Sequence, residues 1–457
     1  MKACWVVTVE LVLESAVHFG GRGDDLADMM LLLDPRESCP LLPGSSLAGA
    51  LRSHLADVLG GYYSAEDGRV ATLFGAVRTD DKGSQSPLIV FDSLGILPAE
   101  HHVEIRDGVQ IDPGSGVAED HKKFDFEILP AGTRFSLRFD LVVSGSSTEG
   151  ELISLLATSL SGLAPNEISL GARRSRGFGI VRAKGWRAFR FDLTSAQGWM
   201  QWLISDSANP MPSDVVSSVD LPSALRGARP GHELNGCEDK RRRTVIEAKL
   251  SLTGGMLIRS APPGPNAPDA AHLKSAGRSI LAGTSLAGVL RGRALRIAHV
   301  VRSSQGDAPQ WVERLFGQKS LAASRLRVTE SAIENGTRLR PSRIQIDRFT
   351  QGVLPGALFD EEPEYGGKLT VRFELRKPEP GEAGLLFLVL KDLLSGELPV
   401  GGTSSVGRGL LRGRARARLD DSTLLDLDVD QPADHDVELI NRKIHEFATS
   451  PSPVEVA

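Results

Sequence analysis

The sequence predicts an α+β protein made of two similar domains in tandem, and three observations lead to this prediction. The chain has 457 residues, which is too long for one ordinary domain and suits two. Hydrophobic residues make up 41% of the chain and charged residues 24%, a balance typical of globular proteins. Four short motifs also occur twice, in the same order, in the two halves of the chain.

The repeated motifs are rich in glycine, small side chains and arginine. One repeated motif can arise by chance, but four in the same order indicate two homologous domains. The pairs are PGSSLAGALR (43–52) and AGTSLAGVLR (282–291), LFG (73–75 and 315–317), VQID (109–112) and IQID (344–347), and GARRSRGFG (171–179) and GGTSSVGRG (401–409).

Composition along the chain gives the expected domain boundaries. The first domain is predicted to span residues 1–204 and the second residues 244–418. Between them, residues 205–243 are rich in Ser, Pro, Asp and Gly and end in four basic residues, as expected for a solvated linker. Residues 419–457 are expected to form an acidic C-terminal tail.

Each half is expected to begin with a strand of alternating side chains, WVVTVELVL (5–13) or VIEAKLSL (245–252). A loop and a tight turn then lead into an amphipathic helix, whose leucines at positions 47, 51 and 55 share one face in the first half. Ser46, and Ser285 in the second half, are expected to cap these helices.

The remaining elements follow in the same order in both halves. The resulting order of strand, helix, two strands, helix and strand is that of a ferredoxin-like domain, the architecture of RRM-like modules. A long section rich in Gly, Pro and charge separates the middle strands and predicts an extended β-hairpin in each half. The expected strands are 86–93, 133–143, 325–331 and 367–377, and the expected helices are 150–163 and 382–396.

Charge and cysteine usage limit the possible partners. The net charge of −5 argues mildly against RNA, because phosphate contacts need Lys and Arg. Arginine is nevertheless concentrated in 172–184, 291–296 and 407–418, while acid collects in 359–364 and 419–436. The three cysteines are scattered, no signal peptide is evident, and no apolar stretch reaches the ~20 residues of a membrane span. A cytoplasmic protein without a membrane partner is therefore expected.

The motifs, in this order, resemble the RAMP superfamily, in particular the backbone subunits of type III CRISPR effector complexes. Two fused copies resemble the double-backbone subunit of type III-D systems, over residues 1–199 less the loops and again over 245–418. The resemblance implies a subunit that binds CRISPR guide RNA and complementary target RNA within a hetero-oligomeric complex of antiviral defence. It also implies that each hairpin is a thumb that displaces a nucleotide of the guide–target duplex.

The resemblance further implies a catalytic carboxylate at Asp28. In the family an Asp stands six residues before an Asp-Pro pair that precedes the PGSS turn, and Asp28 has this spacing to Asp34-Pro35. Asp28 is expected to hold a divalent cation, Mg²⁺, or to orient a ribose 2′-hydroxyl for attack on the next phosphate. Its counterpart in the second half is Asp269, in a shorter loop without Asp-Pro, so one active site and two are both open. The alternative for Asp28 is an exposed loop carboxylate without a chemical role.

Two groups of residues are predicted to bind RNA. Amides and small hydroxyls at the starts of the two helices suit phosphate, although a plain capped helix gives the same pattern. Arginines beside glycines or within the helices suit phosphates and bases, the alternatives being a solvated basic turn or surface ion pairs. The predicted residues are Gly44, Ser45, Ser46, Arg52, Arg173, Arg174 and Arg176 in the first half, and Gly283, Thr284, Ser285, Arg291 and Arg408 in the second.

Three functions are therefore compatible with the sequence. The first is a guide-binding backbone subunit that also cleaves target RNA in a metal-dependent reaction. The second is a structural RNA scaffold without catalysis, and the third is a metal-independent endoribonuclease that processes guides. His18 is a conceivable general acid for the third, but its counterpart is Leu257, which favours a structural or RNA-packing role.

Overall fold

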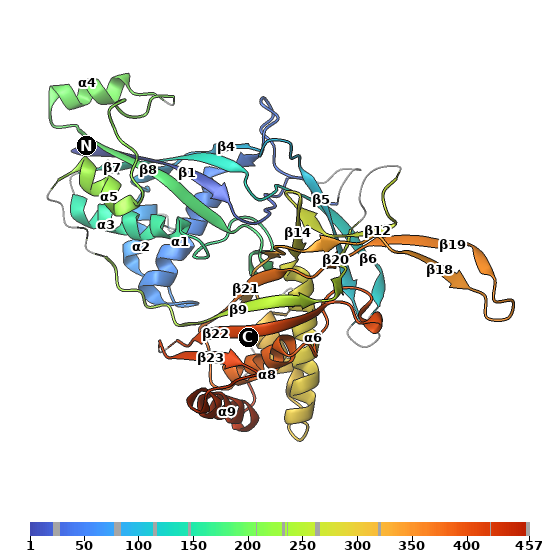
Figure 1. Cartoon of the computed structure of the whole chain (residues 1–457). Coiled ribbons are helices and arrows are strands. Elements are labelled where there is room, and N and C mark those ends of the chain that lie inside the picture. The colour runs from blue at the N-terminus through green and yellow to red at the C-terminus, as the bar shows by residue number, and fades with distance from the viewer. Residues whose placement is uncertain are drawn as a thin grey trace. The chain divides into compact units, whose positions relative to one another are not determined.

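Figure 1 shows the computed structural model of the chain, which separates into two compact units. The second unit incorporates two short pieces of the first repeat. The first unit comprises Met1–Ile105, Asp125–Arg174 and Phe178–Arg241, and the second comprises Arg106–Phe124, Ser175–Gly177 and Arg242–Ala457. The structure describes residues 1–453 except 22–27, 77–83, 113–116, 145–147, 207, 231–233, 235, 261–265, 319–320 and 421.

The first unit is built on an antiparallel sheet in the order β2-β4-β7-β1-β8, with β3 also paired to β7. Two helices, α1 (Gly44–Gly60) and α3 (Glu149–Leu160), pack on one face of this sheet. The strands are β1 (Ala3–Leu13), β2 (Leu41–Leu42), β3 (Leu88–Val90), β4 (Ser93–Ile96), β7 (Arg134–Val143) and β8 (Val181–Asp192).

The second unit repeats this plan in the order β15-β21-β9-β22-β23, with α6 (Gly283–Val301) and α8 (Glu382–Leu394) on one face. Its central strand β9 lies between β21 and β22, just as β1 lies between β7 and β8. The prediction of two similar α+β domains is thus confirmed. The strands are β9 (Arg243–Thr253), β15 (Leu326–Val328), β21 (Lys368–Arg376), β22 (Leu410–Arg418) and β23 (Leu424–Asp428).

The other elements are short or lie outside the two sheets. The helices are α2 (Gly68–Phe74), α4 (Ala196–Ile204), α5 (Leu221–Ala228), α7 (Ala308–Phe316) and α9 (Asp434–Thr449), with 3-10 turns at Ser161–Leu163, Arg174–Arg176 and Ser404–Val406. The strands are β5 (Glu104–Ile111), β6 (Ala118–Ile128), β10 (Gly255–Met256), β11 (Arg259–Ser260), β12 (Ala270–His272), β13 (Lys274–Ser275), β14 (Arg278–Leu281), β16 (Ser331–Ala332), β17 (Thr337–Arg338), β18 (Ser342–Ile346), β19 (Val353–Glu362) and β20 (Glu364–Tyr365).

Alternation along the strands and helical periodicity direct the same apolar residues into each core. In the first unit Val7 and Val9 of β1 meet the Leu47–Leu51–Leu55 stripe of α1, and all five side chains are buried. Each fully buried leucine contributes about 2 kcal/mol through the area it removes from water. These cores hold the repeated motifs in equivalent places in the two units.

The segments outside the expected domains also join the cores. Residues 205–243, expected to be a linker, contain α5, which begins after Asp220 and places Leu221 and Leu225 in the first core. In the expected acidic tail 419–457, β23 pairs with β22 and α9 adds Phe447 to the second core. Both segments are rich in polar residues because their helices and strand each bury one apolar face and expose a polar one.

The starts of α1 and α6 differ from the sequence-based expectation. Pro43 and Ala282 are the N-cap residues and neither helix has a side-chain cap of its own, so the prediction that Ser46 and Ser285 cap them is wrong. Instead the Gly44 amide donates to the Asp92 carboxylate, 2.6 Å away. A Cβ on Gly44 would lie 2.2 Å from the Val90 carbonyl oxygen, so glycine is required for this close approach.

Two long antiparallel hairpins, β5–β6 and β18–β19, occupy equivalent places in the two repeats. The repeated VQID and IQID motifs lie at the end of the first strand of each hairpin. Asp347 accepts hydrogen bonds from the amides of Phe349 and Thr350 and so closes the turn of the second hairpin. The predicted role of these hairpins as thumbs stays a prediction.

One buried contact has different chemistry in the two repeats. In the first repeat the rings of Phe126 and Phe178 pack at a centroid distance of 5.9 Å. In the second repeat Glu361 and Arg408 occupy the corresponding places and form an ion pair of 2.5 Å, with Glu361 fully buried. The correspondence is set by the chain itself, because Phe126 pairs with Met29 as Glu361 pairs with Ala270. An aromatic pair and an ion pair therefore fill the same volume.

This exchange predicts how the second unit responds to substitution. E361F alone should lower the free energy of unfolding by about 3–5 kcal/mol, because it leaves the buried Arg408 guanidinium without its carboxylate. R408F alone should lower it by less, because Glu361 keeps an ion pair with Arg343 at 3.4 Å. The double variant E361F/R408F should recover most of this loss, because it recreates the aromatic pair of the first repeat. Urea unfolding of the four proteins measures the coupling. A double variant whose loss equals the sum of the two single losses would contradict the correspondence.

Candidate RNA-binding surface

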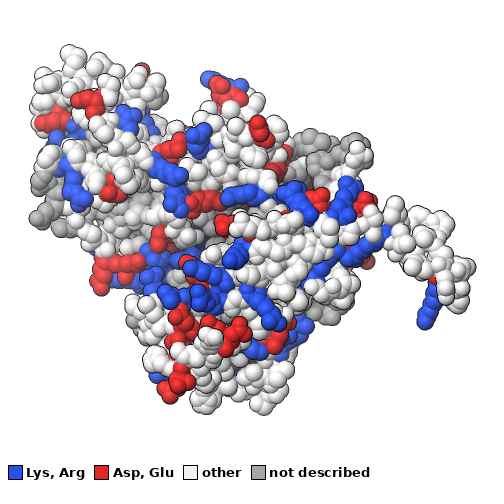
Figure 2. Space-filling view, in the orientation of Figure 1, with Lys and Arg blue, Asp and Glu red and all other residues white. Residues whose placement is uncertain are grey.

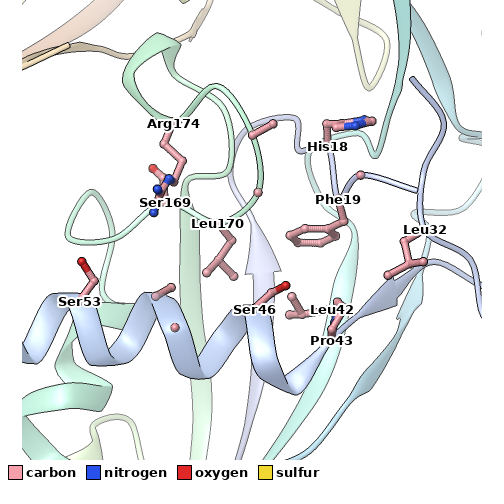
Figure 3. A pocket seen from close by; sticks show the side chains of 15 residues that line it. His18, Phe19, Leu32, Leu42, Pro43, Ser46, Ser53, Ser169, Leu170 and Arg174 are labelled. Atoms are coloured by element: carbon pink, nitrogen blue, oxygen red, sulfur yellow. The ribbon is translucent and has the colours of Figure 1, made fainter. Parts of the chain in front are cut away.

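A hollow of about 460 Å³ lies in the first unit between α1, the glycine-rich turn 171–179 and the chain that follows β1. Figure 3 shows Ser46 and Ser53 of α1 on one side, Ser169, Leu170 and Arg174 opposite them, and His18 and Phe19 at the end. Two of the four repeated motifs thus form facing walls of one cavity.

The face of α1 that lines the hollow carries only small side chains. Ser46, Gly49, Ala50 and Ser53 recur at helical spacing on this face, while the leucines of the same helix point into the core. Small side chains leave room for a ligand to approach the helix closely, and the serine hydroxyls can donate to it. The hollow is therefore polar where it is open.

The glycine-rich turn is held against the end of β1 by backbone hydrogen bonds. The Ala172 amide donates to the His18 carbonyl, and the Leu170 amide donates to the Gly179 carbonyl. Gly179 has a φ of +72°, and a Cβ there would lie 1.8 Å from the Leu170 oxygen. In the second repeat the Gly402 amide donates to Leu257 in the same way. The turn is thus a rigid part of both folds.

The arginines of this turn have three different environments. Arg174 is exposed and lines the hollow, and among the described residues no carboxylate lies within ion-pair distance of it. Arg173 has a positive φ of 56° and its guanidinium lies 4.3 Å from the centre of the Phe126 ring. Arg176 belongs to the second unit, where it donates to the Phe316 carbonyl and burial lowers its pKa.

The repeated arginine of the helix motif contacts the repeated LFG motif. Arg52 donates to the Gly75 carbonyl at 3.1 Å and also pairs with Glu66. Arg291 donates to the Gly317 carbonyl at 2.8 Å. Both arginines satisfy a carbonyl at the C-terminal end of a short helix, as expected for cations at that position. Their common role is structural, and an RNA contact by either one stays a prediction.

The other residues predicted to bind RNA are buried, already hydrogen-bonded or located outside the hollow. Gly44 is buried and its amide is already used by Asp92, while Ser45 is exposed but does not line the hollow. In the second repeat Gly283 is buried and Thr284 and Ser285 are half-exposed. Arg408 is 5% exposed and its guanidinium is bound by Glu361, so we leave it out of the proposed surface.

Asp28 lies at the start of a short stretch that runs beside β6. Its carboxylate accepts a hydrogen bond of 3.0 Å from the Asp125 amide, and its own amide donates to the Asp125 carboxylate at 3.1 Å. A parallel bridge between Met29 and Phe126 follows directly. The reciprocal bonds hold each carboxylate against the backbone of the other residue, with Asp28 exposed.

Asp269 occupies the same place in the second repeat. Its carboxylate accepts a hydrogen bond of 2.8 Å from the Asp360 amide, and β12 continues beside β19 as a parallel pair. Here, however, hydrogen bonds from Ser342 and Arg340 hold the pKa of Asp360 below its usual range. The two sites share a backbone arrangement and, among the described residues, differ in charge, since Arg340 lies beside Asp360 in the second.

Some of these residues were not found from the sequence. Asp125 and Asp360 are contributed by the return strands of the hairpins, and Ser53 and Ser169 line the hollow without belonging to the predicted set. The SxxG and AxxS spacings along α1 carried a signal for Ser53, because they place small residues on one helical face. Nothing in the local sequence pairs Asp28 with Asp125.

His18 is also part of the hollow, although only 4% of its surface is exposed. Its Nδ1 lies 2.7 Å from the Glu127 carbonyl oxygen, which can only accept a hydrogen bond. Nδ1 therefore carries a proton, and in the neutral ring Nε2 is left as an acceptor.

Comparison with known families identifies the chain through both repeats. The RAMP superfamily matches residues 10–182 and again residues 249–412. The chain belongs to the RAMP superfamily. Membership supports a CRISPR-associated, RNA-binding role, and the two matched regions correspond to the two repeats of this RAMP protein. A search of curated proteins found no match. Among the described residues, no helix of the RAMP chain is both long and apolar enough to cross a membrane.

The contact between the helix motif and the LFG motif can be tested by stability. R52A should lower the free energy of unfolding by about 1–3 kcal/mol, because it removes a charged hydrogen bond to the Gly75 carbonyl together with the Glu66 pair. R69A, which removes the exposed pair with Asp67, is the matched control and should cost less. Thermal unfolding measures the loss of stability in both variants. Equal losses for R52A and R69A would show that the hydrogen bond from Arg52 to the LFG motif does not stabilise the fold.

Proposed function

We propose that this chain is a backbone subunit of a type III CRISPR effector complex, in which it binds guide RNA. The observation that carries the proposal is the hollow of the first unit, where a rigid glycine-rich turn, a helix face of small residues and an exposed arginine converge in a RAMP protein. The expected partners are the guide RNA, complementary target RNA and other subunits of the complex.

The domain type is part of this proposal. We assign both units to the ferredoxin-like class, because the order β3-β7-β1-β8, and β15-β21-β9-β22 in the second unit, places the first strand between the third and the last. We take the two hairpins as the thumbs of the family. Ile344, Phe349 and Leu358 on the second hairpin are more than half exposed, as expected for side chains that contact bases.

The hollow suits the backbone of RNA better than its bases. Arg174 offers a planar set of donors to phosphate oxygens, and Ser46 and Ser53 offer hydroxyls to phosphate or ribose. Because the turn is fixed by backbone hydrogen bonds, little conformational entropy is lost on binding. Contacts of this kind are independent of sequence, as a subunit that carries many different guides requires.

RNA affinity tests this site directly. R174E should weaken the binding of guide RNA to the full chain about tenfold or more, because it replaces an attraction to phosphate with a repulsion. R226E makes the same change of charge at an exposed arginine on α5 and is the control. Fluorescence anisotropy measures both. If R174E and R226E weaken RNA binding by the same factor, the hollow is not the RNA-binding site.

Target cleavage is the second part of the proposal. Asp28 and Asp125 fit a Mg²⁺ ion, because they are neighbouring hard oxygen donors and Mg²⁺ in such sites usually takes one or two carboxylates together with substrate phosphates. No cluster of three or more His, Cys, Asp or Glu in the described part of the chain could hold a metal, so the phosphates would complete the set. When bound, the ion would stabilise negative charge on the phosphate under attack.

The residues of the chain contribute orientation and proton transfer. The Asp125 amide fixes one oxygen of the Asp28 carboxylate, and the other oxygen is left to accept the proton of a ribose 2′-hydroxyl. In the second repeat the Asp269 carboxylate is fixed in the same way by the Asp360 amide. The thumb beside each site would displace a nucleotide and so bring the 2′-oxygen into line with the neighbouring phosphate.

Cleavage and binding can be separated experimentally. In the assembled complex with complementary RNA and Mg²⁺, D28A should lower the rate of cleavage at one position of the target at least about a hundredfold. General-base catalysis contributes a factor of this size. D269A should abolish a different cut, and neither variant should change target affinity. D214A, at an exposed loop position, is the control. If the products of D28A were unchanged, the chain would be a structural scaffold at this site.

A metal-independent guide-processing nuclease is the second candidate, and the placement of His18 favours it. Nε2 of a buried His18 beside the hollow could accept the proton of a 2′-hydroxyl. Its counterpart Leu257 cannot, so at most one of the repeats would process RNA in this way. Cleavage of precursor RNA by the isolated chain in EDTA, abolished by H18A, would establish this function in place of the first.

A further inference from the structure

We infer that the open face of the second unit's sheet is a separate binding surface for single-stranded RNA. It shares no residue with the hollow of the first unit and goes beyond the function proposed above. The surface consists of a row of arginines along β22, with lysines on the neighbouring strands β9 and β21. Figure 2 shows basic side chains gathered over these strands.

Strand geometry creates the row. In β22 the side chains of Leu411, Ala415 and Ala417 are buried in the core, while the alternate positions point outward. The outward positions are Arg412, Arg414, Arg416 and Arg418, and all four are exposed. Alternate residues of a strand are about 6.8 Å apart, so the guanidinium groups are spaced regularly along a line. This spacing suits successive phosphates of an extended nucleic-acid strand.

The pairing of strands places both signs of charge beside the row. Asp428 and Asp426 of β23 stand opposite Arg414 and Arg416, and Glu247 of β9 also stands opposite Arg416, while lysines stand beside the other end of the row. Arg414 stands directly opposite Lys249 of β9, and both side chains are exposed. Arg412 stands opposite Ser251, which in turn stands opposite Lys368 of β21. Like charges directly opposite one another destabilise a sheet. A bound polyanion would remove this cost.

Among the described residues, one arginine of the row forms an ion pair. Arg416 pairs with Asp426 at 2.8 Å, but both side chains are more than half exposed, so the pair is weak and exchangeable. Within the described ranges, no carboxylate lies within ion-pair distance of Arg412, Arg414 or Arg418. These guanidinium groups are available to a ligand.

The face is also hollowed. A depression of about 630 Å³ is lined by Lys249, Lys368 and Arg414, together with Ser251 and Thr370. Four carboxylates, those of Glu330, Glu334, Asp428 and Asp430, also line it. Asp428 stands opposite Arg414 on β23, and Glu334 forms a bridge with Lys368 at the other edge, so the RNA strand is expected to follow the arginines of β22 between these carboxylates.

The described residues of the first unit form no equivalent surface. One end of the corresponding face is covered by an apolar cluster that includes Cys4, Val6 and Phe191, on which Trp202 packs. The arginines of its last strand are used within the fold, since Arg182 pairs with Glu14 and Arg190 pairs with Glu149. The basic row is therefore a feature of the second repeat and not a general consequence of the fold.

Charge reversal in the full chain tests the inference. R414E/R418E should weaken binding of a fluorescein-labelled oligouridylate at least about tenfold, and should lower the slope of log affinity against log salt by about 1.4, the value for two lost phosphate contacts on a single strand. R296E/R442E, which makes the same change of charge at exposed positions on α6 and α9 of the same unit, should leave both quantities unchanged.

The outcomes separate this inference from the proposed guide-binding site. Loss of affinity in R174E alone would support the hollow and overturn the basic row, and loss in R414E/R418E alone would do the reverse. If R414E/R418E keeps its RNA affinity but loses a protein subunit of the complex, the row is a protein interface and the inference is wrong. R414Q/R418Q should show a smaller loss in the same direction if the reversed charges impair folding.

Discussion

The structure depends on the close contact between the glycine-rich turn and the end of the first strand in each repeat. The amide of residue 172 or 402 donates to the carbonyl of residue 18 or 257, and Gly179 and Gly409 lie where a side chain cannot fit. Through the backbone alone, this contact fixes the turn that leads into β8 or β22 against the chain that follows β1 or β9. The contact is therefore compatible with different side chains on the turn, and the two repeats carry different side chains there.

Comparison of the repeats shows which features belong to the fold and which belong to function. The backbone contacts of the turn, the arginine that binds the LFG carbonyl and the carboxylate held by a hairpin amide are present twice. The arginines of the glycine-rich turn are not. Arg173 and Arg174 of the first turn correspond to Thr403 and Ser404 of the second, so the second turn presents no arginine at these places. Positive charge in the second unit is found on β22 instead.

The sequence predicted what depends on local pattern. Repeated motifs identified two domains, and alternation and helical periodicity identified the core faces of β1, α1 and their counterparts. The pattern failed where a residue is defined by a partner far along the chain. Ser46 has the side chain of a helix cap, but Asp92, in the connection between β3 and β4, accepts from the first amide of the helix instead. The buried Glu361 that binds Arg408 was likewise not foreseen, and an RNA contact by Arg408 stays a prediction. Long-range partners such as these cannot be read from a single sequence.

The correspondence between Asp28 and Asp269 is another feature that the sequence alone left open, and here the structure supports the expected alignment. Their loops differ in length, and only the first carries an Asp-Pro pair, so sequence spacing alone left the alignment uncertain. The hairpin amides remove the ambiguity, because each carboxylate accepts from the residue that precedes a parallel bridge.

Net charge is a poor guide to the partners of this chain because the charges are separated in space. Fields from exposed charges are screened within about 8–10 Å at physiological ionic strength, so a ligand responds to the local surface and not to the total of −5. The acidic residues of α9, such as Asp434 and Glu438, lie on a helix that packs against α8, and α8 covers the face of the sheet opposite the arginine row. A phosphate chain on β22 would meet the arginines at contact distance, with the core of the unit between it and these carboxylates. An acidic protein can therefore present a locally basic surface, because a large part of its negative charge, such as that of α9, lies away from the arginine row.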